Sequence, residues 1–152
     1  MDRWPNFFIA GAPRCGTSSL HAYLQQVPGV FMARIKEPNY FSHSVIGDRH
    51  PMVKPIRDER RYLRLFAEAG DATAVGEATP FYLEDRLAPS LILRCSPDAR
   101  VVVSLRDPVE RLYSHYLMMK NNLPALGSFL DEIHRGLALD GDPNAAVLKA
   151  ST

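Results

Sequence analysis

A glycine-containing loop near the start of the chain carries the residue types that bind anions. Residues 11–18 read GAPRCGTS and follow a short apolar run at residues 6–10. Glycines let successive backbone N–H groups converge on one anion, and the start of a helix adds unpaired N–H donors and a positive dipole end. The alternative is an ordinary turn in which a threonine caps the helix. We favour a phosphate or sulfate cradle, because a cation and several donors coincide there: Arg14, Cys15, Gly16, Thr17, Ser18 and Ser19.

Two better-known phosphate-binding loops fit these residues poorly. The nucleoside triphosphate loop, G-x-x-x-x-G-K-[ST], has a lysine where this chain has Thr17, which argues against an ordinary ATPase or kinase. A cysteine phosphatase loop needs an arginine six positions after its cysteine, whereas His21 stands six positions after Cys15. We therefore interpret Cys15 as a small residue in a tight loop.

A second candidate anion site lies later in the chain. Arg106 follows an apolar run at residues 100–105, and Ser114 stands two turns into a helix that begins at Pro108. Open α/β sheets bind ligands at the carboxyl ends of their strands. Arg106 and Ser114 could therefore hold one phosphate; taken alone, the stretch also fits a helix start with solvent-facing arginines.

These two stretches resemble the two donor-binding motifs of sulfotransferases that use 3′-phosphoadenosine 5′-phosphosulfate (PAPS). Residues 13–20, PRCGTSSL, resemble the 5′-phosphosulfate loop P-K-S-G-T-[ST]-[SW]-L, with arginine in place of lysine. Residues 106–116, RDPVERLYSHY, resemble the 3′-phosphate motif R-[DN]-P-x-[ED]-R-x-x-S-x-[YF]. The resemblance implies PAPS as donor, 3′,5′-bisphosphoadenosine as product, Arg106 and Ser114 as ligands of the 3′-phosphate, and no metal.

A third segment resembles the family's acceptor side. Residues 36–41, KEPNYF, are similar to the K-E-P-x-[YF]-F segment of the carbohydrate-type sulfotransferases, including the heparan sulfate group. The resemblance implies that Glu37 is the general base, that Lys36 contacts the sulfuryl group or the leaving oxygen, and that Arg14 stabilises the leaving phosphate. It also favours an acceptor hydroxyl on a carbohydrate, with lipid or small-molecule alcohols as the alternatives. The cytosolic relatives use a histidine instead, so three alternatives stay open: His43, His50 and His115.

One family position departs from the pattern. Residues 76–82, GEATPFY, resemble G-E-K-[ST]-P-x-Y, but Ala78 stands where relatives carry a lysine that helps at the reaction centre. The loss puts the rate or the orientation of the acceptor in doubt, and Lys36 is the residue that could compensate.

The elements that must position these residues alternate along the chain. Apolar runs and helical periodicity predict the class α/β, a P-loop-like three-layer α/β/α arrangement with a mostly parallel sheet. The continuous apolar run near residues 100–105 predicts a strand buried on both faces, and Leu20, Tyr23 and Leu24 predict the buried face of the first helix. The predicted strands are 6–10, 30–32, 74–77 and 100–105. The predicted helices are 17–24, 58–69, 83–94 (broken at or beginning at Pro89), 108–120 and 128–139, with a long loop at 36–55 and a new helical pattern at 145–152.

Composition limits the remaining possibilities. The charges are 18 Lys+Arg against 17 Asp+Glu, which removes the basic excess typical of a nucleic-acid binder. No apolar run approaches the roughly 20 residues of a membrane span. The two cysteines form neither a disulfide framework nor a zinc site. We expect one domain over residues 1–152 in a reduced, cytoplasmic protein.

The resemblance also sets the alternatives. The family's domain is usually longer, so we expect this chain to be its N-terminal portion without the C-terminal part. A shortened sheet would expose an apolar face, which predicts a homo-oligomer. The rival readings are a truncated, non-catalytic nucleotide-binding remnant and a P-loop nucleotide kinase.

Overall fold

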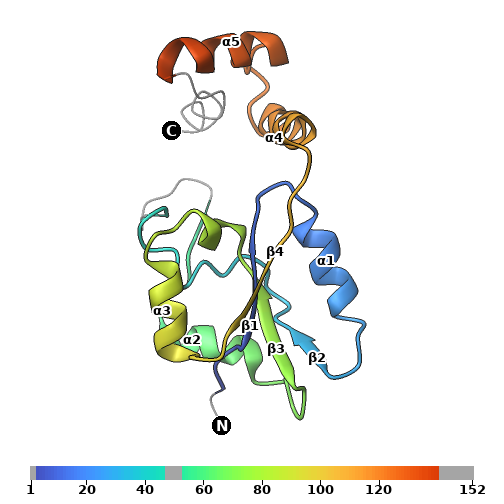
Figure 1. Cartoon of the computed structure of the whole chain (residues 1–152), viewed down its shortest axis with the longest axis vertical. Helices are drawn as coiled ribbons and strands as arrows, with labels where there is room; N and C mark the ends of the chain where they lie inside the picture. The colour runs from blue at the N-terminus through green and yellow to red at the C-terminus, as the bar shows by residue number, and fades with distance from the viewer. Residues whose placement is uncertain (1–2, 47–52, 141–152) are drawn as a thin grey trace. The chain divides into compact units, whose positions relative to one another are not determined.

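The chain forms two compact units, Met1–Leu105 and Arg106–Thr152, and each is described by itself. The structure is a computed structural model that describes residues 3–46 and 53–140 (Figure 1). His50 and the helical pattern expected at 145–152 lie outside the described residues.

A parallel sheet forms the centre of the first unit. Its strand order is β2-β3-β1-β4, and every pairing between neighbours is parallel. The central strand β1 lies between β3 and β4, with Phe7 opposite Gly76 on one side and opposite Arg100 on the other. All predicted strands are confirmed; their bounds are β1 Phe7–Gly11, β2 Val30–Met32, β3 Ala74–Ala78 and β4 Arg100–Val103.

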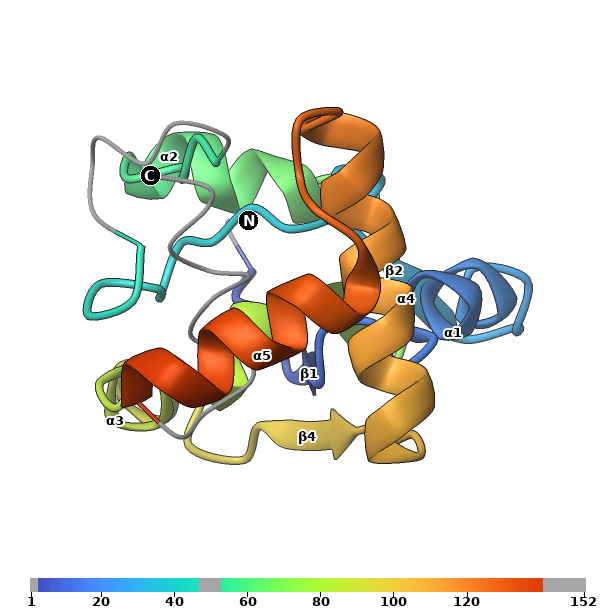
Figure 2. The ribbon, with the colours of Figure 1, turned by 90° about the horizontal axis from the view of Figure 1, so that it is seen from above.

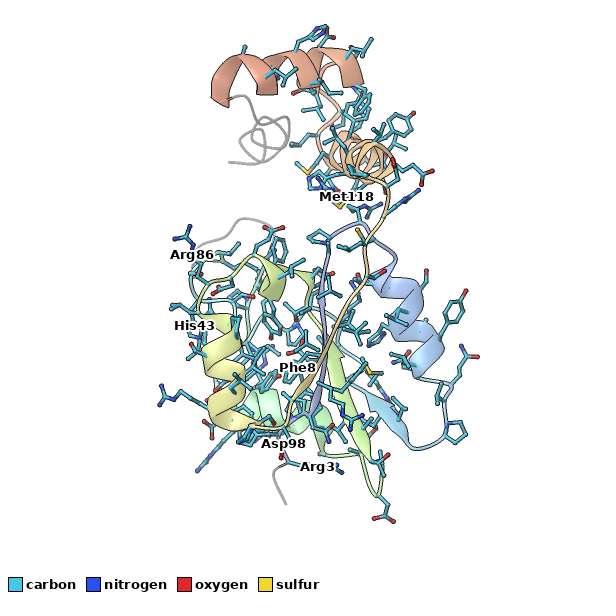
Figure 3. The ribbon with its side chains drawn as sticks, viewed as in Figure 1. Arg3, Phe8, His43, Arg86, Asp98 and Met118 are labelled. Carbon is cyan, nitrogen blue, oxygen red and sulfur yellow. The ribbon has the colours of Figure 1, made fainter. Side chains whose placement is uncertain are left out.

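Helices cover both faces of this sheet. The helix α1, Thr17–Leu24, lies on one face, while α2, Glu59–Leu63, and α3, Ala88–Cys95, lie on the other (Figures 1 and 2). Alternating side chains of β1 reach both layers: Phe8 packs on the α3 side, where Figure 3 labels it, and Ile9 packs on the α1 side. The predicted α/β/α layering is confirmed.

Aromatic rings fill the core on the α3 side. Tyr40 stacks on Tyr62 with ring centroids 4.1 Å apart, and Phe41 meets Phe8 and Tyr82 edge to face at 6.1 and 5.8 Å. Such offset and edge-on contacts are the favoured geometries of aromatic pairs. They fix the segment that follows Glu37 against the sheet.

The prediction that the strand at residues 100–105 is buried on both faces was wrong. Among the described residues β4 lies at the edge of the sheet, and Val101 and Val103 are 53% and 41% exposed. The apolar run identified a strand, but it could not show whether a neighbour covers that strand.

Two predicted helices are shorter than expected. The segment expected at 58–69 is α2 followed by a 3-10 turn, η1 Arg64–Phe66, because Ala67 N–H and Ala69 N–H bond to carbonyls three residues back. The helix expected within 83–94 is α3, which begins at Ala88 with Pro89 in its first turn and so confirms the expected break or start at Pro89; a 3-10 turn, η2 Pro80–Leu83, precedes it. The break is set by Asp85, whose carboxylate accepts the N–H groups of Leu87 and Ala88 at 2.8 and 3.1 Å and so caps α3.

The buried face of α1 also differs from the prediction. Leu20 and Leu24 pack on the sheet, but Tyr23 is 67% exposed. His21 takes the buried place instead, and its Nε2 lies 2.9 Å from the Ala33 carbonyl oxygen. A hydrogen bond to the loop after β2 therefore decides which residues of α1 face inward.

The second unit holds the helices α4, Pro108–Asn122, and α5, Phe129–Asp140, as predicted apart from small differences at their ends. Asp107 caps α4 by accepting from Val109 N–H and Glu110 N–H at 3.0 and 3.1 Å. A small apolar cluster joins the helices, with Tyr116, Met119 and Leu126 at its centre. Within the described residues no helix is long and apolar enough to cross a membrane.

Candidate functional site

The loop after β1 is held from the end of β4. Ala12 N–H donates to the Ser104 carbonyl oxygen and Ser104 N–H donates to the Gly11 carbonyl oxygen, both at 2.8 Å. The Ser104 hydroxyl reaches further and donates to the Cys15 carbonyl oxygen at 2.7 Å. These bonds fix the predicted anion loop at the carboxyl edge of the sheet, where such folds bind ligands.

The N-terminus of α1 is open toward this loop. Its cap residue is Gly16, at φ 80°, and no side chain caps the helix, so the alternative of a capping threonine is not what the structure shows. The first turn holds no acidic residue, and a Cβ placed on Gly16 would meet nothing within 4 Å. Unpaired N–H donors beside open space fit an anionic sulfate or phosphate group.

The side chains of the loop divide by exposure. Arg14, Ser18 and Ser19 are exposed, whereas Cys15 and Thr17 are only 5% exposed. The buried Cys15 thiol lies 3.7 Å from the Pro13 carbonyl oxygen, in keeping with a small residue in a tight turn. The exposed groups are those that could contact a ligand with their side chains.

Lys36 and Glu37 form a close ion pair. Lys36 Nζ lies 2.5 Å from Glu37 Oε1, and the two side chains are 24% and 38% exposed. Within the described residues, Glu37 Oε2 makes no hydrogen bond. The pair thus holds one carboxylate oxygen in place and leaves the other accessible.

Backbone bonds bring Glu37 to the same edge of the sheet as the anion loop. Glu37 N–H donates to the Ala78 carbonyl oxygen at 2.9 Å, at the end of β3. Ala78 is paired with Ile9 of β1, and Thr79 N–H donates to the Ile9 carbonyl oxygen at 3.0 Å. The candidate base, which is bonded to the end of β3, and the candidate anion loop, which follows β1, therefore lie at the ends of two neighbouring strands.

The side chain at position 78 points into the core. Ala78 is fully buried in the cluster with Ile9 and Met32 on the α1 side of the sheet. Lys36, which the sequence suggested as a substitute for the lysine of relatives, is committed to the ion pair with Glu37.

Sequence reasoning missed the residues that hold the long loop after Lys36. The Arg57 guanidinium donates to the carbonyl oxygens of Asn39, Tyr40, Ser42 and Ile46 at 2.7–3.4 Å. No motif contains Arg57, and its sequence neighbours give no signal for this role.

Asp85 holds the same loop from the other side. Its Oδ2 accepts Ser44 N–H and Val45 N–H at 2.7 and 3.1 Å, while Oδ1 caps α3. Burial alone would raise the pKa of Asp85, but these hydrogen bonds outweigh it and lower the pKa below the ordinary 3.8.

Glu77 is a third residue whose role the sequence did not reveal. It is fully buried, and its carboxylate accepts hydroxyl hydrogen bonds from Tyr62 and Tyr82 at Oε1, at 2.8 and 2.6 Å, and from Thr79 at Oε2, at 2.5 Å. Burial raises the pKa of Glu77, and the three hydroxyl donors oppose that rise. The motif at 76–82 contains two of the three partners, Thr79 and Tyr82, but only the fold adds Tyr62.

Arg106 and Ser114 belong to the second unit. Arg106 Nε donates to Glu110 Oε2 at 3.0 Å across one turn of α4, and the two side chains are 43% and 63% exposed. Ser114 is half-buried on the same helix. Their predicted contact with a phosphate stays a prediction.

The alternative histidines differ in their surroundings. His43 is exposed and lies on the α3 side (Figure 3), beside a pocket of about 310 Å³ that Leu91, Arg94 and Cys95 also line. His115 lies on α4 in the second unit. Within residues 3–46 and 53–140, no group of three or more His, Cys, Asp or Glu could hold a metal ion.

Comparison with known proteins gives one consistent result. A family profile described as "Sulfotransferase domain" matches residues 5–139. Human carbohydrate sulfotransferase 15 is 28% identical over 179 residues, covering 89% of this chain and 31% of that protein. Human heparan sulfate glucosamine 3-O-sulfotransferase 6 is 32% identical over 127 residues, covering 84% of this chain and 34% of that protein.

A solved structure agrees with these sequence matches. The sulfotransferase from Alicyclobacillus acidocaldarius superimposes with a TM-score of 0.78 at 36% identity, over 88% of this chain and 57% of that one. The chain thus spans about a third of the length of the curated relatives named here. The matched fold and the matched residues 5–139 place this chain in the sulfotransferase domain family.

Proposed function

We propose that this protein transfers a sulfuryl group from PAPS to a hydroxyl group of a carbohydrate acceptor. The observation that carries the proposal is the placement of Glu37 beside the anion loop. Glu37 is bonded to the end of β3, and the loop that opens α1 follows the adjacent strand β1. A base and an anion cradle at one sheet edge are the two parts that transfer of a charged group to a hydroxyl requires.

Glu37 serves as the general base in this proposal. As the acceptor oxygen forms its bond to sulfur, Glu37 Oε2 takes the hydroxyl proton, while Lys36 holds Oε1. The sulfur–oxygen bond to the 5′-phosphate breaks, and 3′,5′-bisphosphoadenosine leaves. A positioned base of this kind contributes roughly 10²–10⁴-fold to the rate.

The loop at the start of α1 stabilises the charge that develops on the leaving group. The donors proposed there are the N–H groups of the first helical turn, Thr17 N–H among them, and the exposed Arg14 guanidinium. Preorganised donors of this type are worth about 3–4 kcal/mol each when well placed. Gly16, Ser18 and Ser19 complete the cradle through their backbone N–H groups and the two serine hydroxyls, while Cys15, whose N–H donates to the Ala12 carbonyl oxygen at 3.2 Å, holds the turn of the loop.

Arg106 and Ser114 bind the 3′-phosphate in this proposal. They touch no reacting atom, so their contribution is binding energy that orients the donor and separates PAPS from ATP. The carbohydrate acceptor is supported by the names of the relatives, which act on carbohydrate or heparan sulfate glucosamine. The cytoplasmic location and the homo-oligomer stay predictions.

A transfer assay with an acceptor panel tests this function. The chain is incubated with ³⁵S-labelled PAPS and with heparan sulfate oligosaccharides, chondroitin oligosaccharides or a simple phenol, without added metal. We expect label in an oligosaccharide and none in the phenol. Label in the phenol alone would refute the carbohydrate acceptor. Label in none of them, with bisphosphate binding retained, would favour the non-catalytic remnant.

A further inference from the structure

Glu77 is a buried carboxylate whose hydrogen bonds are unusual for a residue that only packs in a core. Its side chain has no exposed surface, and three hydroxyl groups donate to its two oxygens. Carboxylates in protein interiors are costly unless they are paired or fully hydrogen-bonded, and apolar residues commonly replace them without loss. A buried carboxylate that accepts three hydroxyl hydrogen bonds therefore indicates a role other than packing.

The two tyrosines bonded to Glu77 both hold the segment that follows Glu37. The Tyr82 hydroxyl donates to Glu77 and accepts from Phe41 N–H at 3.4 Å. The Tyr62 ring stacks on Tyr40, with planes 11° apart. Each tyrosine thus connects the Glu77 carboxylate to the Tyr40–Phe41 pair, one through its hydroxyl and the other through its ring.

The start of the same segment is fixed beside Glu77. Glu37 N–H bonds to the carbonyl oxygen of Ala78, the residue after Glu77, at 2.9 Å. Glu37 has φ 58° and Asn39 has φ 54°, and the Asn39 amide donates to the Glu37 carbonyl oxygen at 2.7 Å. Non-glycine residues keep such backbone angles only where surrounding contacts enforce them.

We propose that Glu77 is a positioning residue: its carboxylate orients the Tyr62 and Tyr82 hydroxyls so that they clamp Tyr40 and Phe41, and the clamp sets the direction in which Glu37 presents its side chain. The inference deepens the proposed function, because it rests on Glu37 as the base. It assigns no proton transfer to Glu77, which touches neither Glu37 nor the anion loop in the described contacts.

The test is a double-mutant cycle built from two near-isosteric variants. Glu77→Gln keeps the shape of the side chain and removes its charge, while Tyr82→Phe removes the hydroxyl that links Glu77 to Phe41. If Glu77 acts through the clamp, each variant lowers kcat by about tenfold, because small misplacements of a reacting group are costly. The double variant then loses about tenfold rather than about a hundredfold, because both changes break the same unit. KM for PAPS stays unchanged.

The matched control is Ser96→Ala. It also removes one hydroxyl hydrogen bond of the first unit, to the Pro5 carbonyl oxygen at 2.6 Å, but the Ser96 hydroxyl donates neither to Glu77 nor to residues 37–41. Its kcat is expected to stay within about twofold of the parent, like that of a surface change remote from the site. If Ser96→Ala lowers kcat as much as Tyr82→Phe does, general destabilisation explains the effect and the proposal is wrong.

Hydrogen exchange of individual amides separates this proposal from the function on which it rests. The clamp predicts that Glu77→Gln and Tyr82→Phe reduce protection at Glu37 and Phe41 by about tenfold or more, with Ile9 and Val75 unchanged, since local opening then needs fewer broken contacts. Unchanged protection at Glu37 and Phe41 would overturn the clamp, whatever the activity. Lost protection in a chain that transfers no sulfate would support the clamp and reject the proposed function.

Discussion

Arg14 and Glu37 share an uncommon backbone conformation, with φ values of 67° and 58°. Each such non-glycine residue costs on the order of 1–3 kcal/mol, and strain of this kind clusters at functional sites. The third non-glycine residue of the described chain with positive φ is Asn39, which bonds back to Glu37. The strain therefore gathers at the two residues proposed for charge stabilisation and proton transfer.

Replacing Glu37 by glutamine tests the base. Glu37→Gln keeps the size of the side chain but cannot accept the proton, so turnover is expected to fall by roughly 10²–10⁴-fold. Binding of 3′,5′-bisphosphoadenosine, followed by calorimetry, stays the same. The control is Glu68→Gln, which alters an exposed ion pair with Arg34 and leaves Glu37 intact. Undiminished turnover in Glu37→Gln would remove Glu37 from the mechanism.

Replacing Arg106 tests the predicted 3′-phosphate contact. Arg106→Ala is expected to weaken 3′,5′-bisphosphoadenosine by about 10–100-fold, the value of a charge-assisted hydrogen bond. Adenosine 5′-phosphosulfate, which lacks the 3′-phosphate, loses little. Arg34→Ala serves as control for the lost charge, because Arg34 is 83% exposed and belongs to the first unit, Met1–Leu105. Equal losses for both ligands would contradict the assignment.

One residue, Asp85, holds both the loop between β2 and α2 and the first turn of α3. Its carboxylate accepts two N–H groups from the loop and two from the start of α3, and these hydrogen bonds outweigh burial and lower the pKa of Asp85 below 3.8. A carboxylate with a lowered native pKa stabilises the fold above its unfolded value and loses that contribution as the pH falls through the native value. Asp85→Asn is therefore expected to lower the free energy of unfolding by about 1 kcal/mol at pH 7.

The difference between parent and Asp85→Asn is expected to shrink as the pH falls below 3.8. Urea unfolding at about pH 7 and about pH 3 measures it. The exposed Asp71 supplies the control, Asp71→Asn, which should behave like the parent at both pH values. A difference that grows in acid would contradict the sign of the pKa shift.

The position of each strand in the sheet predicts how much stability is lost when one of its valines is replaced by alanine. Val75 of β3 is fully buried, whereas Val101 of β4 is 53% exposed. Val75→Ala is expected to lower the free energy of unfolding by about 2 kcal/mol, and Val101→Ala by less than about half of that. Equal losses in urea unfolding would indicate that β4 is covered in solution, as in the predicted homo-oligomer.

The sequence was informative where a pattern is local. Alternation of strands and helices predicted the layers, and Pro108 after Asp107 predicted the start of α4. The exposure of β4 could not be predicted, because a run of apolar residues does not indicate whether a neighbouring strand is present. The roles of Arg57 and Glu77 were equally hidden, since their partners lie far away in the sequence and meet only through the fold.

At the scale of the whole molecule, the two donor motifs lie in different compact units. The anion loop and Glu37 belong to Met1–Leu105, and Arg106 and Ser114 belong to Arg106–Thr152. The chain also covers 57% of the bacterial sulfotransferase that it resembles. Donor binding by this chain is therefore the claim on which the proposed chemistry depends.

Calorimetric titration of the 152-residue chain with 3′,5′-bisphosphoadenosine, against ATP with magnesium, tests that claim most directly. Binding of the bisphosphate without metal, together with much weaker binding of ATP with magnesium, is the result predicted by a PAPS site. Magnesium-dependent binding of ATP would instead indicate a nucleotide kinase. No binding of the bisphosphate would contradict donor binding by this chain.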